Sequence, residues 1–240
     1  MSTGTIYTTG EYLDGNPTWH VEDSAWKAAH IETIVRRNQL SPKRIAEVGC
    51  GAGQILAELW SRLADDVEFF GFEVSPQAYD LCKPLERERL HFHLEDLASQ
   101  EQRFDLLLVI DVIEHVDDYL GFMRSLAPKC DYAAFHIPLD ISAQAVLRKS
   151  SFDSVREEVG HIHYFTEETA IASVREAGYR VVDCFLTAGA IELSGGGLKR
   201  RVASLPRRAL AAINPSYAAK LLGGFSLMVL AKAESSAVDT

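Results

Sequence analysis

Histidines follow several apolar runs of this 240-residue chain and could move protons. Those that follow a predicted strand, or lie in the segment before a later predicted helix, are His115, His136, His161 and His163. Imidazole has an ordinary pKa near neutrality, so each of the four is a candidate general base. His91 and His93 alternate along a predicted strand, and we assign them a structural role.

A glycine loop joins the first apolar run to a helical stretch. Its glycines are Gly49, Gly51 and Gly53, and Glu47 precedes them. Without a Cβ, such a loop lets a ligand approach the backbone at the start of a helix, where unpaired N–H groups collect. The dinucleotide fingerprint needs a glycine where this chain has Gln54, and the Gly-Lys-Ser/Thr ending of a P-loop is absent. The loop therefore predicts a cofactor site of another kind, and a ligand-free turn is the alternative.

An acidic residue ends the second apolar run. Glu73 follows Phe69 to Phe72 and lies about 24 residues beyond the first glycine, the placement at which doubly wound folds bind ribose hydroxyls (~20 residues on). We expect Glu73 to bind a ribose. A carboxylate at a strand end can instead cap the next helix, and this alternative stays open.

The glycine loop followed by an acidic strand end resembles the motif order of class I S-adenosylmethionine (SAM)-dependent methyltransferases. The glycine loop is similar to their SAM loop, and residues 111–118 are similar to the motif after the fourth strand in ubiquinone-type O-methyltransferases. The resemblance covers residues 40–190 best and implies that Asp96 accepts a hydrogen bond from the adenine amino group. The cofactor contacts expected from the loop, the strand ends and the resemblance are Glu47, Gly49, Cys50, Gly51, Gly53, Glu73, Val74, Asp96, Leu97, Asp111 and Trp19.

A second resemblance concerns a metal. Small-RNA terminal 2′-O-methyltransferases hold a divalent ion with a Glu-x-x-Glu-His motif and a later His, and this chain offers Asp111, Glu114, His115 and His161 in that order. The resemblance implies a Mg²⁺ or Mn²⁺ site and selects His115 and His161 as the catalytic pair. Asp111 is one methylene shorter than the Glu of that family. In the alternative, Glu114 and His115 only pack and cap, and His161 orders a loop.

Apolar runs and helical stretches alternate along the chain, which predicts an α/β fold with a mostly parallel sheet. The expected strands are 43–48, 67–73, 89–93, 104–110, 131–137, 179–187 and 225–232. The expected helices are 24–37, 54–64, 76–83, 117–126 and 167–177, the last ended by Gly178. The methyltransferase resemblance implies a Rossmann-like seven-stranded sheet with helices on both faces and an antiparallel last strand. In the first helix, Trp26, Ala29, Ile31, Ile34 and Val35 are expected on the buried face.

The chain divides into two predicted regions. Residues 1–40 form an aromatic arm with a helix, and the resemblance implies that the arm, including Trp19, closes over the cofactor as a lid. Residues 41–240 form the methyltransferase domain, with insertions before and after the sixth strand, at 139–160 and 194–224. The first insertion is expected to form one helix that closes over the pocket. The second insertion has no acidic residue and contains Lys199, Arg200, Arg201, Arg207, Arg208 and Lys220. It predicts contact with an anionic substrate, a membrane surface or a second subunit, and a solvated helical hairpin is the alternative.

Composition narrows the function further. A net charge of −10 disfavours a nucleic-acid partner. Four separated cysteines without a C-x-x-C pair suggest reduced thiols, and we expect a cytoplasmic monomer or homodimer without a signal peptide. The expected reaction is methyl transfer from SAM to a hydroxyl of a small metabolite or sugar, assisted by a His base or a divalent metal. Transfer to N or C, a nicotinamide-dependent oxidoreductase and a SAM-binding protein without transfer activity are the alternatives.

Overall fold

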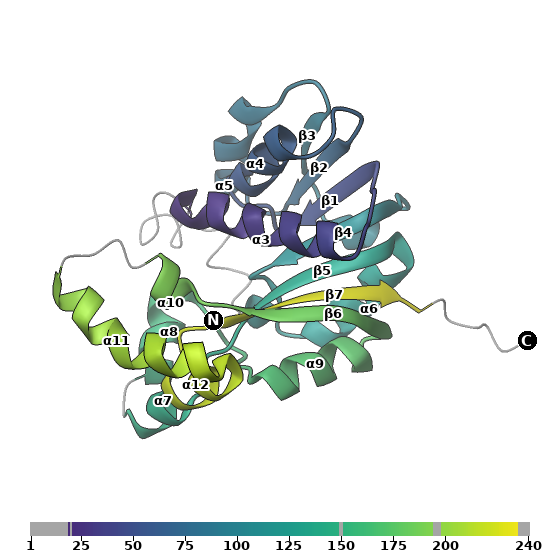
Figure 1. Cartoon of the computed structure of the whole chain (residues 1–240). Coiled ribbons are helices and arrows are strands. Elements are labelled where there is room, and N and C mark those ends of the chain that lie inside the picture. Colours follow the sequence, from purple (N-terminus) through teal and green to yellow (C-terminus); the bar gives the residue numbers. More distant parts are fainter. Residues whose placement is uncertain (1–18, 20, 149–150, 194–197, 235–240) are drawn as a thin grey trace, which may run out of the picture.

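The computed structural model describes residues 19, 21–148, 151–193 and 198–234 (Figure 1). The arm predicted over residues 1–18 lies outside the described residues, so only Trp19 of the expected lid can be placed. Within the described part of the chain, no helix combines the length and the apolar character needed to cross a membrane.

Seven strands form one sheet, as the sequence predicts. They are β1 (Arg44–Val48), β2 (Glu68–Glu73), β3 (Leu90–Leu94), β4 (Phe104–Ile110), β5 (Cys130–Pro138), β6 (Tyr179–Thr187) and β7 (Ser226–Ala233). The order across the sheet is β3-β2-β1-β4-β5-β7-β6. Strands β1 to β5 pair in parallel, and β7 is antiparallel to both of its neighbours. Each predicted strand end is correct to within one residue, and the antiparallel last strand is confirmed.

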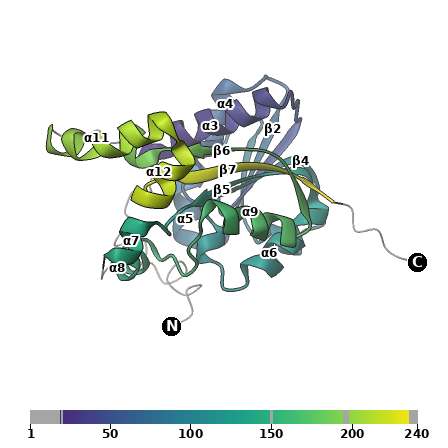
Figure 2. The ribbon, with the colours of Figure 1, turned by 60° about the horizontal axis from the view of Figure 1, so that its bottom comes forward.

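Helices cover both faces of the sheet (Figures 1 and 2). Those on one face are α3 (Ser24–Arg37), α4 (Gln54–Arg62) and α5 (Pro76–Cys82), and those on the other are α6 (Tyr119–Leu126), α9 (Glu167–Glu176) and α12 (Pro215–Leu222). The remaining helices are α7 (Ala143–Leu147), α8 (Ser151–Val159), α10 (Gly189–Glu192) and α11 (Leu198–Ile213). The layered α/β architecture predicted from the sequence is therefore confirmed.

Side chains of the central strand alternate between two cores. On β4, Leu106 and Leu108 pack with the α3–α4 side, whereas Leu107 and Val109 pack with the α6–α9 side. All four side chains are at most 1% exposed, so burying each contributes roughly 1.5–3 kcal/mol. This double burial fixes β4 at the centre of the sheet and thereby fixes the residues that follow it.

Two predictions about helices need correction. Trp26 and Ala29 were expected on the buried face of α3, but they are only half-buried, and Ser24 and Ala28 are buried instead. The buried stripe of α3 is thus rotated so that Lys27 faces the protein. The segment 139–160, expected to hold one closing helix, holds α7 and α8.

Two glycines with positive φ provide a test of local packing. Gly53 has φ +74°, and a Cβ there would lie 2.5 Å from Cε1 of Phe92. Gly178, which ends α9 as predicted, has φ +87°, and a Cβ there would meet nothing within 4 Å. Gly178→Ala should cost about 1–2 kcal/mol of unfolding free energy through backbone strain alone. Gly53→Ala should cost about 1–3 kcal/mol more because of overpacking. Urea unfolding of both variants without ligand measures this difference. Equal losses of unfolding free energy would show that the Phe92 side chain moves to make room for the added methyl group.

Candidate functional site

A cavity opens at the carboxyl ends of β1 and β4, which are neighbours in the sheet. Chain connections run outward in opposite directions from these two strands, the point at which open α/β sheets bind ligands. The cavity volume is about 330 Å³. Among its lining residues are Trp19, Lys27, Glu47, Gly49, Gly51, Gly53, Asp111, His115, His136 and His161. Most of the predicted site residues therefore meet in one place.

The glycine loop is held against the second strand. The Gly51 N–H donates to Oε2 of Glu73 at 2.8 Å, and the Gly49 N–H donates to the Phe72 carbonyl at 2.8 Å. A Cβ on Gly51 would lie 2.6 Å from Cδ1 of Trp19, so glycine is required for Trp19 to lie against the loop. This contact places Trp19 beside the predicted cofactor cradle, and its role as a lid stays a prediction.

Four predicted cofactor contacts lie outside the lining of this cavity. Glu73 is 5% exposed, and its carboxylate also accepts from the Val74 and Ser75 N–H groups at 2.8 Å. Burial raises the Glu73 pKa, although these backbone donors oppose the rise. Asp96 is exposed and caps the 3-10 helix η3 (Leu97–Ser99), in which Leu97 is buried. Val74 is 55% exposed. The roles of these residues at the cofactor remain predictions.

Glu47 brings a buried carboxylate to the cavity. It is 2% exposed, and its Oε2 atom has no hydrogen-bond partner among the described residues. Burial raises its pKa well above the ordinary value, and nearby Lys27 opposes this rise. A cationic group of a ligand entering the cavity would provide the missing partner.

A chain of polar contacts crosses the floor of the cavity. Lys27 Nζ lies 2.8 Å from Asp111 Oδ2 and 3.0 Å from Asp23 Oδ2. The Nδ1 atom of His136 lies 2.6 Å from Asp111 Oδ1, and its Nε2 atom lies 2.9 Å from the Thr187 hydroxyl. Burial alone would raise the Asp111 pKa, but His136 and Lys27 outweigh it and lower that pKa. Asp111 is therefore a carboxylate held between two nitrogen groups.

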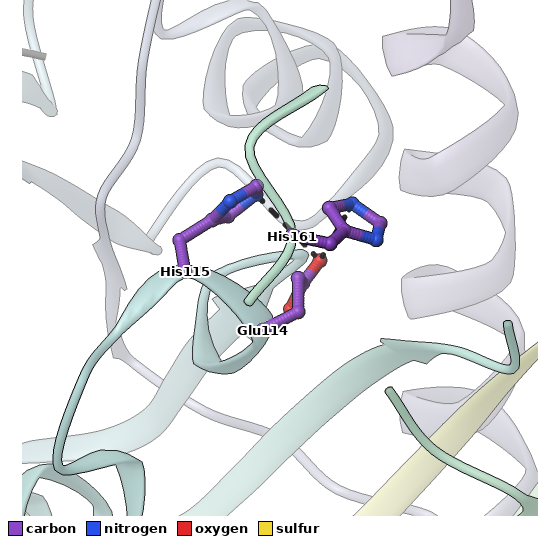
Figure 3. Close-up of side chains that lie close together, drawn as sticks. All are labelled: Glu114, His115 and His161. Carbon is purple, nitrogen blue, oxygen red and sulfur yellow. Dashed lines mark ion pairs between the residues drawn. The ribbon is translucent and has the colours of Figure 1, made fainter. Parts of the chain in front are cut away.

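A second group of side chains lies beside these polar contacts and consists of Glu114, His115 and His161 (Figure 3). The Nε2 atoms of both histidines lie 3.9 Å from Glu114 Oε1. Backbone contacts build the group, because the Ile162 and His163 N–H groups donate to the Glu114 carbonyl at 2.9 and 3.1 Å. The segment that carries His161 is thereby docked on the 3-10 helix η4 (Ile113–His115), which follows β4.

The hydrogen bonds of the two rings determine which nitrogens face the carboxylate. His115 Nδ1 lies 3.1 Å from the Gly160 carbonyl, and His161 Nδ1 lies 2.7 Å from Asp140 Oδ2. Carbonyl and carboxylate oxygens only accept, so each Nδ1 donates, and the Nε2 atom of each ring is left to face Glu114. Burial, with help from His161, lowers the His115 pKa to about 4, which keeps this ring neutral at pH 7.

The Glu114 carboxyl group is the buried member of this group. Its side chain is 0% exposed, and neither carboxylate oxygen has a hydrogen-bond partner among the described residues. Burial raises its pKa well above the ordinary value, and Asp111 adds to this rise. A proton on Glu114 or a cation between the three side chains would relieve this arrangement.

The structure therefore brings together three of the four predicted metal ligands. Asp111 is absent from the group that could hold a metal, because Lys27 and His136 occupy both of its oxygens. His136 lies in the cavity, whereas His163 Nε2 contacts the Val116 and Asp117 carbonyls at 3.0 and 3.2 Å.

Sequence reasoning missed three residues of the site. Lys27 has the helical spacing of the buried Ser24 and Ile31, and this spacing could have revealed it. Asp140 supports His161, and Thr187 supports His136. A lone carboxylate or hydroxyl near a strand end carries no comparable signal.

The basic insertion contributes arginines that contact backbone. Arg207 donates to the Gly223 and Leu222 carbonyls at 2.8 and 2.9 Å, and Arg208 donates to the Ile191 carbonyl at 3.0 Å. The side chains of Lys199, Arg200 and Arg201 lie outside the described residues. Contact of this insertion with a membrane, an anionic substrate or a second subunit stays a prediction.

Comparisons with known proteins agree with this fold and this loop. Residues 24–183 match the family model described as "Methyltransferase domain". The mitochondrial ubiquinone biosynthesis O-methyltransferase of Schizosaccharomyces pombe is 32% identical over 130 residues, which cover 51% of this chain and 46% of that protein. The ubiquinone biosynthesis O-methyltransferase of Cereibacter sphaeroides is 33% identical over 89 residues, 34% of each chain. The chain thus spans about a third to a half of the length of these relatives.

A solved structure shares the fold. Magnesium protoporphyrin IX methyltransferase from Synechocystis PCC 6803, with S-adenosylhomocysteine (SAH) bound, gives a TM-score of 0.59 at 13% identity, covering 88% of this chain and 83% of that one. Because the family model covers most of the sheet and its glycine loop, the chain belongs to the methyltransferase domain family, among its class I SAM-dependent members.

Proposed function

We propose that this protein transfers the methyl group of SAM to a hydroxyl oxygen of a small hydroxylated molecule. One observation supports oxygen as the atom that accepts the methyl group. The Glu114, His115 and His161 group lies at the wall of the cavity that contains the glycine loop. Methyl transfer is a displacement by a nucleophile, so a hydroxyl must lose its proton during the reaction. The neutral His115 ring and the neighbouring His161 ring, beside a buried carboxylate, supply groups suited to that task.

The charges of the cavity support SAM as the ligand. The methionyl part of SAM carries an ammonium and a carboxylate. Glu47 offers an unpartnered, buried carboxylate oxygen, and Lys27 offers an ammonium group at the same cavity. Burial raises the Glu47 pKa, and a bound ammonium would stabilise its ionised form. Lys27 and the N–H groups at the start of α4 suit the carboxylate of the zwitterion.

The relatives support a small-molecule acceptor. Two of them are named for O-methylation in ubiquinone biosynthesis, although each matches this chain over only part of its length. A sugar hydroxyl is a second candidate acceptor, because its methylation is also transfer to a hydroxyl oxygen. Formation of SAH from SAM with a panel of diols and sugars tests the proposal, and SAM binding without SAH formation for any acceptor would favour a SAM-binding protein without transfer activity.

The Glu114, His115 and His161 group fits a divalent cation. One carboxylate oxygen and two imidazole nitrogens converge, and the second nitrogen of each ring is anchored by an outer partner. Such a cation would lower the pKa of a hydroxyl bound to it. With Asp111 paired elsewhere, nitrogen ligands outnumber oxygen ligands, so Mn²⁺ or another transition ion suits the group better than Mg²⁺. His115 and His161 would orient the acceptor oxygen or, without a cation, accept its proton.

A substitution at Glu73 tests the cofactor site. Glu73→Gln removes the charge and replaces one accepting oxygen with an NH2 donor, so it also loses either the Gly51 contact or the Val74 and Ser75 contacts of the carboxylate. The loss of a charge-assisted bond to a ribose hydroxyl should weaken SAM and SAH binding by about 1.5–3 kcal/mol. Calorimetric titration measures the effect, and Glu68→Gln, at the exposed start of the same strand, is the matched control. Unchanged SAH affinity in Glu73→Gln would remove Glu73 from the site, and tight NADH binding by the parent would refute the proposed cofactor.

A substitution at Glu114 separates a metal ligand from a protonated carboxyl group. Glu114→Gln imitates the protonated side chain, so a metal-free enzyme should keep its turnover. An enzyme that uses a metal should lose turnover by about 10² or more while SAM binding survives. Turnover is measured with and without EDTA, followed by addition of Mn²⁺ or Mg²⁺.

The histidines complete this test. His115→Asn and His161→Asn should each reduce turnover by about 10² or more, whereas His91→Asn, on β3 outside the cavity, should not. Full turnover in both variants would exclude a base or metal role for these histidines. The protein would then assist the reaction only by aligning the acceptor with SAM.

A further inference from the structure

A second cavity adjoins the first and contains two arginines. Its volume is about 340 Å³, and Pro138, Gly189 and Ser226 line both cavities. Arg148, which follows α7, and Arg207, on α11, are among its lining residues. The two predicted insertions, before and after β6, therefore each place a guanidinium group beside the methyl-transfer cavity.

The loop before β7 holds Arg207 in place. Its Nε and Nη2 atoms donate to the Gly223 and Leu222 carbonyls at 2.8 and 2.9 Å. A Cβ on Gly224 would lie 3.3 Å from Arg207 Nε and 2.6 Å from Ala190 Cβ. A side chain at residue 224 would therefore clash with Ala190 and crowd the guanidinium group, which the two carbonyl contacts hold in place before any ligand arrives.

The charges of the two arginines are not neutralised by the described residues. Among the ion pairs of the described residues, none includes Arg148 or Arg207. Partial burial, together with the like charge of Arg148, lowers the Arg207 pKa. Asp140 also lines this cavity, but its Oδ2 atom is held by His161 at 2.7 Å. Two like charges at one cavity cost free energy that an anion would recover.

We propose that this second cavity binds a carboxylate or phosphate group of the methyl acceptor through Arg148 and Arg207. This inference rests on the proposed methyl transfer and narrows its substrate class to anionic hydroxylated molecules. Guanidinium groups bind both anions through paired N–H donors. Asp140 connects the two cavities, because it lines the second and orients His161 in the first. An acceptor held by its anionic group would present its hydroxyl to the histidine pair.

Paired probes that differ by one anionic group test this binding site. Protein saturated with SAH is titrated with 3,4-dihydroxybenzoate and catechol, and with phenyl phosphate and phenol. We expect at least one anionic probe to bind about tenfold or more tightly than its neutral partner, because charge-assisted bonds to an anion are lost in the neutral compound. The first pair reports on a carboxylate and the second on a phosphate. Equal affinities within both pairs would overturn the proposal.

Variants assign the preference to the two arginines. Arg148→Gln, which removes an exposed side chain, and Arg207→Gln should each reduce the preference, and the double variant should abolish it. Arg208→Gln, on the same helix but outside the cavity lining, should retain it. A preference that survives in the double variant would also overturn the proposal. If the loop shifts in Arg207→Gln, Arg148→Gln alone decides.

These titrations do not require turnover. Failure of the parent to bind SAH would count against the proposed function, whereas SAH binding without any preference for anions would count against the second cavity alone.

Discussion

The part-buried contact between Lys27 and Asp111 is the constraint on which the site depends. It joins the first helix to the residue after the central strand, across a span of 84 positions in the sequence. Asp111 has a positive φ of 53°, an uncommon conformation for a non-glycine residue, and its carboxylate is fixed by nitrogen groups on two sides. Removing either charge would leave Lys27 paired with Asp23 alone or Asp111 paired with His136 alone, and the helix would lose its link to the strand. The orientation of His136, and with it the floor of the cavity, follows from this pair.

Two carboxylates three residues apart have opposite environments. Asp111 meets an ammonium and an imidazole, so its pKa falls, whereas Glu114 is fully buried and lies near the Asp111 charge, so its pKa rises. Separated pKa values are what an active site needs to divide its work between neighbouring groups. Asp111 keeps a permanent negative charge that organises the cavity, and Glu114 is left to share a proton or a cation with the histidines.

Much of the fold could be predicted because its signals are local. The alternation of apolar runs locates β4 to the residue, and Gly178 ends α9 as its position indicates. The histidine group was predicted through motif order, whereas Asp111, predicted as a fourth member, pairs with Lys27 and His136 in the structure. The spacing in residues 111–115 does not reveal a lysine that comes from a distant helix. Long-range pairs such as Lys27 with Asp111 are decided by packing of elements, which single-sequence patterns do not encode.

The last two strands of the sheet hold both ends of the segment that connects them. Thr187 and Ser226 are paired across β6 and β7, so the polypeptide between them leaves and re-enters the sheet at adjacent positions. A loop anchored in this way tolerates replacement, since doubling its length costs only about 0.6 kcal/mol of closure entropy. An exchange of residues 188–225 would therefore leave both strands in place and replace the part of the second cavity that carries Arg207, while Arg148 and the glycine loop lie outside the exchanged segment.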